Sequence, residues 1–251
     1  MNCDLKKRLR AGETVVGTWA TIGHQDVVDV LETSKLDWVV MDTEHAPLGP
    51  EAVSRMIQAI DPAHMCPLVR VGAVDQTLVK SALDMGAHGV LFPLVSSREE
   101  AERAVRFAKY PPEGVRGVAP RKAADYGRSF SEYLRSANDQ TIVVVQIETG
   151  EALGNLDAIL SVPRVDVAFV GPSDLTMSLG LVDDRGNPRV VKAMEQVIKA
   201  CEEHGKTPGV LAATPDEAKR DVALGFRFIG LGSDVRFLQA GAEEFIRAAR
   251  R

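Results

Sequence analysis

The 251-residue chain is 45% hydrophobic and 26% charged, a composition that excludes a disordered, collagen-like or coiled-coil protein. Lys and Arg total 30 against 35 Asp and Glu, and the formal net charge of −5 argues against a nucleic-acid partner. No apolar run approaches the ~20 residues that cross a bilayer, and the charged start lacks the apolar core of a signal peptide, so we expect a soluble protein without a membrane partner. The three cysteines, Cys3, Cys66 and Cys201, are far apart and lack metal-type spacing, which favours a reducing cytoplasm.

Eight short runs rich in β-branched residues alternate with longer amphipathic segments. Several runs are almost continuously apolar, as parallel strands buried on both faces need to be. Between them, Ser97 and Glu100 have the spacing of a capping box, and residues 190–201 carry an apolar stripe at helical spacing. We expect strands at Val15–Trp19, Trp38–Met41, Pro67–Val71, Gly89–Phe92, Ile142–Ile147, Val165–Val170, Thr207–Leu211 and Phe226–Leu231.

This alternation predicts a parallel α/β architecture. Eight repeats in about 250 residues favour one closed (β/α)8 TIM barrel over an open sheet, and no linker divides residues 1–251 into two domains. The longest irregular stretch, residues 110–140, is expected to form an elongated loop over one barrel face with a short helix near 131–137.

Polar residues gather where the predicted strands end. In a closed barrel the carboxyl ends of the strands meet at one face, where active sites lie. Singly, such residues could cap helices, as Asp174 could for residues 175–179, but together they favour an active site. The set comprises Asp42–Pro47 after the second strand, Arg70 on the third, Gln146 and Glu148 on the fifth, and Ser173 and Asp174 after the sixth.

These residue types suit metal-assisted chemistry. Glu148 and Asp174 offer two oxygen ligands to a hard cation such as Mg²⁺ or Mn²⁺. Arg70 could hold a carboxylate or stabilise an enolate, and His45 could act as a general base through a water. No lysine ends a predicted strand, so a Schiff-base mechanism lacks its nucleophile.

The motifs Asp42–Pro47, Tyr110–Gly117, Gln146–Thr149 and Gly171–Leu175, with Arg70, resemble the HpcH/HpaI class II pyruvate aldolases. The resemblance spans nearly the whole chain and implies a barrel of the phosphoenolpyruvate/pyruvate-domain type. It further implies reversible cleavage of a 4-hydroxy-2-oxo acid to pyruvate and an aldehyde, with a divalent metal (Mg²⁺, Mn²⁺ or Co²⁺) stabilising the enolate and no organic cofactor. It also implies a homo-oligomer, a hexamer built as a trimer of dimers, in which C-terminal helices are exchanged.

The resemblance assigns individual roles. His45 matches the catalytic base, Arg70 the enolate stabiliser, and Asp84 the partner that raises the basicity of the histidine. The predicted topology puts Asp84 late in a helix, near the opposite end of the barrel from His45, so either that boundary is wrong or the contact is made across subunits. Glu148 and Asp174 match the metal ligands, and Gln146, Ser173 and Asp174 match the pyruvate contacts.

Three alternatives remain open at this point. The same metal-enolate site could run a decarboxylation or a citrate-lyase-type reaction. Separately, residues 118–127, which the resemblance places near the aldehyde, differ from the loop of the dioate aldolases and leave the identity of the aldehyde open. Residues 230–234 weakly resemble a barrel phosphate loop, which would suit a sugar-phosphate isomerase. A non-catalytic oligomeric scaffold is the third alternative, and it predicts no bound metal.

Overall fold

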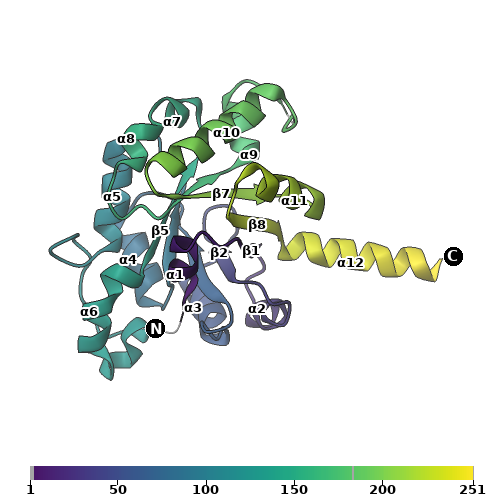
Figure 1. The fold of residues 1–251 in the computed structure, drawn as a ribbon. Helices are drawn as coiled ribbons and strands as arrows, with labels where there is room; N and C mark the ends of the chain where they lie inside the picture. Colours follow the sequence, from purple (N-terminus) through teal and green to yellow (C-terminus); the bar gives the residue numbers. More distant parts are fainter. Residues whose placement is uncertain (1–2, 183, 251) are drawn as a thin grey trace.

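The computed structural model describes residues 3–182 and 184–250, which contain a closed barrel of eight parallel strands (Figure 1). Each strand pairs with the next, and β8 pairs with β1 to close the ring. The TIM-barrel prediction is therefore confirmed. The strands are β1 (Val15–Ala20), β2 (Trp38–Asp42), β3 (Cys66–Arg70), β4 (Gly89–Phe92), β5 (Ile142–Ile147), β6 (Val167–Val170), β7 (Thr207–Ala212) and β8 (Phe228–Ser233).

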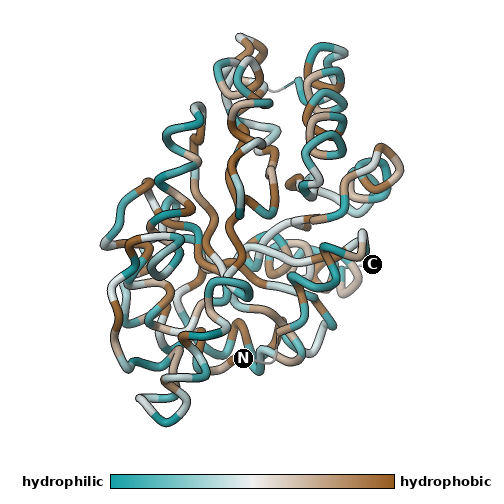
Figure 2. The backbone as a smooth tube through the Cα atoms, turned by 60° about the vertical axis from the view of Figure 1, so that its left-hand side comes forward, coloured by the Kyte–Doolittle hydropathy of each residue, from teal (hydrophilic) through white to brown (hydrophobic). Residues whose placement is uncertain are grey.

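Helices surround this ring, most of them between consecutive strands. The helices are amphipathic and pack their apolar faces onto the strands. Figure 2 shows hydrophobic residues concentrated along the central strands. The helices are α1 (Leu5–Arg10), α2 (Gln25–Glu32), α3 (Pro50–Ala59), α4 (Gln76–Asp84), α5 (Arg98–Ala108), the 3₁₀ helix η1 (Lys122–Gly127), α6 (Phe130–Gln140), α7 (Gly150–Gly154), α8 (Leu156–Leu160), α9 (Pro172–Ser178), α10 (Pro188–Glu203), α11 (Pro215–Leu224) and α12 (Asp234–Ala249).

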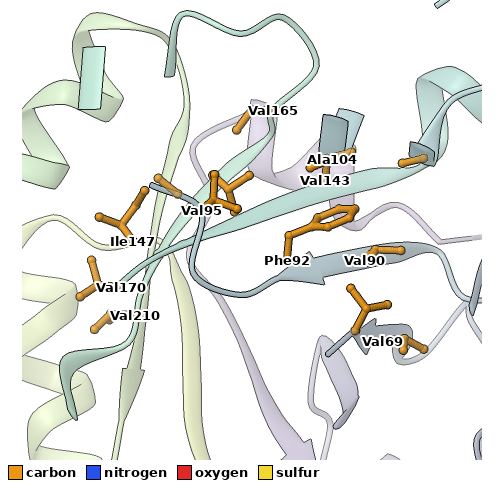
Figure 3. Packing of buried hydrophobic residues seen from close by; sticks show 14 of the residues in the cluster. Val69, Val90, Phe92, Val95, Ala104, Val143, Ile147, Val165, Val170 and Val210 are labelled. Atoms are coloured by element: carbon orange, nitrogen blue, oxygen red, sulfur yellow. The ribbon is translucent and has the colours of Figure 1, made fainter. Parts of the chain in front are cut away.

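Two apolar layers hold the barrel together. Side chains on its inside include Trp38 and Phe228, whose rings stack with centroids 4.2 Å apart. On the outside, Val69, Val90 and Val143 from three neighbouring strands pack side by side against the helix layer (Figure 3). Because both faces of the strands are buried, the continuous apolar runs in the sequence are explained.

Aromatic rings inside the barrel need glycine on the adjacent strands. A Cβ atom added to Gly17 would overlap the Trp38 side chain, and one added to Gly230 would overlap Trp19. Glycine here allows close approach of a ring to the backbone. Gly230 therefore has a packing role that does not depend on a phosphate ligand.

We call the end of the barrel at the carboxyl ends of the strands the mouth, and the opposite end the floor. Residues 109–141 connect α5 to β5 at the floor, where Lys109 donates to the carbonyl oxygen of Thr141 at 2.8 Å. Lys122 and Asp125 of η1 line a cavity of about 490 Å³ together with His88, which directly precedes β4. Within one chain, the expectation that residues 118–127 meet the aldehyde portion is therefore wrong. The connection between a helix and the next strand lies at the floor, away from the mouth.

The two chain ends differ in their packing. Leu5 and Leu9 of α1 are buried against the floor, whereas α12 extends away from the barrel (Figure 1). Cys3, just ahead of α1, forms a disulfide with Cys66 at the start of β3. The sequence did not predict this pairing, because 63 residues separate the two cysteines along the chain. Among the described residues, no helix is both long and apolar enough to span a bilayer.

Candidate active site

Arg70 is held at the mouth by a carboxylate on the neighbouring strand. The register of β2 and β3 places Asp42 beside Arg70, and the guanidinium donates to both oxygens of Asp42, at 2.9 and 2.7 Å. Burial opposes ionisation of Asp42, but the hydrogen bonds from Arg70 outweigh it and lower the pKa of that carboxyl. This bidentate pair fixes the orientation of the planar guanidinium. Asp42 belongs to the segment 42–47 that the sequence places at the mouth, but no specific role was predicted for it, although it ends its strand just as Arg70 does.

Glu44 stands at the other side of the same guanidinium. Its Oε2 atom lies 3.1 Å from Nη1 of Arg70, yet that buried oxygen accepts no hydrogen bond from the described residues. Burial raises the pKa of Glu44 despite the nearby positive charge. Arg70 is thus shared between two carboxylates, and Glu44, for which no specific role was predicted, contributes a partly compensated charge to the mouth.

Glu148 is the most deeply buried carboxylate of the predicted metal pair, with 4% of its surface exposed. It accepts hydrogen bonds from the side-chain amide of Gln146 at 2.7 Å and from the backbone N–H of Leu94 at 3.2 Å. Burial raises the pKa of Glu148 to about 7, and the nearby charges of Asp174 and Glu44 add to that rise. The mouth therefore gathers more negative charge than Arg70 alone balances.

Backbone shape gives Glu148 its room. Gly171 follows β6 on the neighbouring strand, and a Cβ atom there would overlap the carboxylate of Glu148. Leu94 has a left-handed φ of 51°, a strained conformation for a leucine that aims its N–H at the carboxylate. Gln146 keeps its Oε1 atom buried without a hydrogen bond from the described residues. An unpaired buried acceptor of this kind is a free contact for a ligand donor.

His45, Ser173 and Asp174 form the outer part of the mouth. His45 is 67% exposed at the side chain, and its Nε2 atom lies 3.8 Å from Oε2 of Glu44. Ser173 and Asp174 occupy the first turn of α9 and are exposed, and the Ser173 hydroxyl accepts a hydrogen bond from Arg185. These positions leave all three side chains accessible to a ligand entering the mouth.

Asp84 lies apart from this group. It is the last residue of α4, as the sequence predicted, and it accepts a hydrogen bond at 3.0 Å from the buried Arg116. Arg116 also donates to the Tyr133 hydroxyl at 2.9 Å, so Asp84 belongs to a network on the segment between α5 and β5. Among the described residues, no hydrogen bond or ion pair joins Asp84 to His45. The predicted helix boundary is correct, and it puts the two residues at different ends of one barrel.

Residues 230–234, which weakly resemble a phosphate loop, have another role in the structure. The carboxylate of Asp234 accepts hydrogen bonds from the backbone N–H groups of Thr21 and Ile22, both at 2.8 Å, and from the Thr21 hydroxyl at 2.7 Å. These bonds tie the start of α12 to the loop after β1. A carboxylate in this position disfavours an anion, so the main support for a sugar-phosphate isomerase is lost.

Known proteins resemble this chain over nearly its whole length. The family model described as HpcH/HpaI aldolase/citrate lyase matches residues 16–240. A 4-hydroxy-2-oxo-heptane-1,7-dioate aldolase of Escherichia coli is 40% identical over 245 residues, which cover 97% of this chain and 93% of the relative. A pyruvate aldolase of Rhizobium etli is 40% identical, with 95% of this chain and 94% of the relative covered.

Solved structures show the same relationship. The crystal structure of an HpcH/HpaI aldolase/citrate lyase family protein from Burkholderia cenocepacia superimposes with a TM-score of 0.95, at 35% identity, over the full length of both chains. The protein therefore belongs to the HpcH/HpaI aldolase/citrate lyase family and is a carbon–carbon lyase.

Proposed function

We propose that the protein is a divalent-metal-dependent pyruvate aldolase that reversibly cleaves a 4-hydroxy-2-oxo acid to pyruvate and an aldehyde. The main support is the buried carboxylate Glu148, which shares the mouth with Asp174 and Glu44 while Arg70 is already engaged by Asp42. A negatively charged 2-oxo acid needs positive charge at the mouth to bind there, and the side chains of the mouth provide too little positive charge.

The donor set fits a hard divalent cation. Glu148 and Asp174 would hold it, because carboxylate oxygens are the ligands that Mg²⁺, Mn²⁺ and Co²⁺ accept in common. The raised pKa of Glu148 indicates that an extra positive charge at its oxygens would be stabilising. When bound, such a cation supplies Lewis-acid stabilisation of the enolate that carbon–carbon cleavage produces.

The remaining side chains bind and move protons. Arg70, oriented by Asp42, would direct Nη1, the nitrogen that also faces Glu44, at the oxo-acid oxygens and oppose their growing negative charge. Gln146 and Ser173 would contact the pyruvate portion. His45 would take the 4-hydroxyl proton through a water and later help to protonate the enolate carbon.

Asp84 enters this scheme only through a neighbouring subunit. Its carboxylate lies at the opposite end of the barrel from its own His45, so a positioning contact has to come from another copy of the chain. Mixing His45→Ala and Asp84→Asn proteins tests this. Subunit exchange should restore sites that combine an intact His45 with an intact Asp84, and about a quarter of wild-type activity returns at random mixing. Mixtures as inactive as their components would contradict the contact.

A homo-oligomer is also supported by α12. Leu238 is 66%, Phe245 80% and Ile246 52% exposed on the projecting helix, and an apolar groove of about 460 Å³ runs between α12 and α2. We propose that second copies of the chain cover this surface by exchanging the helix, in a hexamer arranged as a trimer of dimers. Light scattering should give six subunits for wild type and for Glu244→Gln, and smaller species for Phe245→Glu. A monomeric wild type would contradict the assembly.

The function is tested by aldol formation from pyruvate. Metal-stripped enzyme is supplied with Mg²⁺, Mn²⁺ or Co²⁺ and with succinic semialdehyde, glyceraldehyde, lactaldehyde or glycolaldehyde in turn. We expect no product without metal, restoration by at least one metal, and a preference for one aldehyde. Glu148→Gln should stay inactive with every metal. Full activity after chelation would overturn the proposal, and carbon dioxide release without aldehyde would identify a decarboxylase instead.

A further inference from the structure

Three side chains with metal-binding atoms meet at the floor, far from the carboxylates of the mouth. The Sγ atoms of Cys3 and Cys66 and a ring nitrogen of His88 all lie within 4.8 Å of one another. Cys66 is 1% and His88 7% exposed, while Cys3 is half-buried. The His88 imidazole has no role in the proposed reaction or in the barrel core. Its side chain makes no hydrogen bond to the described residues.

The barrel framework fixes two of the three residues. Cys66 opens β3 and His88 directly precedes β4, which is the neighbouring strand. The backbone N–H of His88 donates to the Pro67 carbonyl at 2.8 Å, so the two side chains stand on one rigid ladder. Cys3 arrives from the other side, on the residues that lead into α1, and burial of Leu5 on the floor holds it in place.

Two thiols and an imidazole are a soft donor set. Thiolate ligands select thiophilic cations such as Zn²⁺, whereas the oxygen ligands of the mouth suit Mg²⁺ or Mn²⁺. Around tetrahedral zinc, ligand atoms stand roughly 3.5 to 3.8 Å apart, given Zn–S bonds of about 2.3 Å. The mutual distances at the floor allow this geometry with small side-chain movements. A cavity of about 490 Å³, lined by His88, gives solvent access from the side of η1.

We propose that, when the cysteines are reduced, Cys3, Cys66 and His88 form a second metal site that binds a thiophilic divalent cation of the zinc class. Each cysteine gives up its thiol proton to solvent as its sulfur binds, and a solvent molecule completes the fourth position. The site uses no residue to which the proposed aldolase reaction assigns a role.

The disulfide and the metal site exclude each other, since both use the same two sulfur atoms. A trialkylphosphine converts one into the other. The S–S bond breaks, phosphorus gives up two electrons and takes oxygen from water, and the two protons of that water go to the two thiols. The bound cation then replaces the disulfide as the link between the segment before α1 and β3. We expect it to stabilise the folded chain, because the unfolded chain holds no such preformed site.

Cobalt titration of the full-length protein tests the site without measuring activity. Phosphine-reduced, metal-free protein is titrated with Co²⁺ under argon, and the thiolate-to-cobalt charge-transfer absorption is recorded. Carboxylate ligands at the mouth do not produce this band. We expect one cobalt per chain with sulfur ligation, complete displacement by Zn²⁺, and a higher Tm with Zn²⁺ than without it.

Variants separate this site from accidental thiol binding. Cys3→Ser, which changes a half-buried residue, and Cys66→Ser should each abolish the two-sulfur band, and His88→Ala should weaken cobalt binding by more than tenfold. Cys201→Ser removes a buried cysteine elsewhere in the barrel and should bind as wild type does. Absence of the band in reduced wild type would overturn the proposal. So would a band that persists in Cys3→Ser or in protein kept in its disulfide form.

Discussion

The two ends of the barrel bury charged side chains in opposite ways. At the floor, Lys6 donates to the Thr141 carbonyl at 2.7 Å and pairs with Asp166 at 2.9 Å, and Lys109 donates to the carbonyls of Asn138 and Thr141. At the mouth, Glu44 keeps a buried oxygen that accepts no hydrogen bond from the described residues, and the pKa of Glu148 is raised to about 7 by burial among other carboxylates.

This difference separates stability from function. Burial of a charge costs free energy that hydrogen bonds offset, and the floor meets much of that requirement within the chain, although burial still lowers the pKa of Lys109 to about 7. At the mouth, part of this requirement is not met within the chain. A ligand that carries positive charge or hydrogen-bond donors would therefore gain binding free energy there. Substitutions at the mouth should therefore change activity more than stability, and substitutions of the floor residues Lys6, Lys109 and Asp166 should do the reverse.

Arg70→Lys should have the largest effect on activity. An ammonium cannot donate two parallel hydrogen bonds to Asp42 and still present a donor to the substrate, so we expect kcat/KM to fall by ~10²–10³. The matched control is Arg98→Lys on α5, whose exposed partner is Glu102, and it should keep wild-type activity. Retention of more than a tenth of the activity by Arg70→Lys would break the link between the fixed guanidinium and catalysis.

His45→Ala should lower kcat by about 10², the lower range for a general base. Because the His45 side chain is 67% exposed, its loss should leave Tm unchanged. His64→Ala removes a histidine of similar exposure, 72%, between α3 and β3 and serves as the control. A His45→Ala enzyme with full cleavage activity would remove His45 from the mechanism.

The sequence was sufficient to predict the barrel but not all of its contacts. Strands buried on both faces produce continuous apolar runs, so six of the eight were placed to within a residue at each end, whereas β6 begins two residues later and β8 lies two residues later than expected. The same logic located Arg70 and Glu148 at strand ends. It missed Asp42 as the partner of Arg70, because that pairing depends on the register between β2 and β3, which a single sequence does not reveal.

Long-range proximity explains the other differences. Residues 118–127 were expected at the substrate because of the resemblance to the dioate aldolases. Their place at the floor follows from α5, which carries the chain from the mouth end of β4 back across the barrel. Cys3 and Cys66 meet because α1 packs against the floor of the barrel through the buried residues Leu5 and Leu9. The spacing of the cysteines in the sequence does not indicate this contact.

Lys6→Met tests the floor. Removing one partner of a buried pair leaves the Asp166 carboxylate uncompensated, and we expect the free energy of unfolding to fall by about 3 kcal/mol with kcat unchanged. Urea unfolding at fixed protein concentration measures the change, and Lys7→Met on the exposed face of α1 is the control. A loss of activity without a loss of stability would show that the two ends are not separated in the way that their hydrogen bonds indicate.

The pH dependence of stability tests the mouth without substrate. The pKa of Glu148 rises from its usual 4.5 to about 7 in the folded chain, so the folded state binds more protons than the unfolded state between these values. Glu148 therefore lowers the free energy of unfolding as pH rises from about 5 to 7, by at most ~3 kcal/mol, with no further change above that range. Asp221, whose pKa burial raises to about 6, acts in the same direction, so the comparison must be made between variants at each pH.

In metal-free protein, Glu148→Gln should be the more stable form at pH 8 and should approach wild type near pH 5, because an amide has no charge to desolvate. Addition of Mn²⁺ should stabilise wild type more at pH 8 than at pH 6, since the ligand must lose its proton, and should leave Glu148→Gln nearly unaffected. A Glu148→Gln protein less stable than metal-free wild type at pH 8 would mean that Glu148 serves the fold as Lys6 does. The mouth would then no longer differ from the floor.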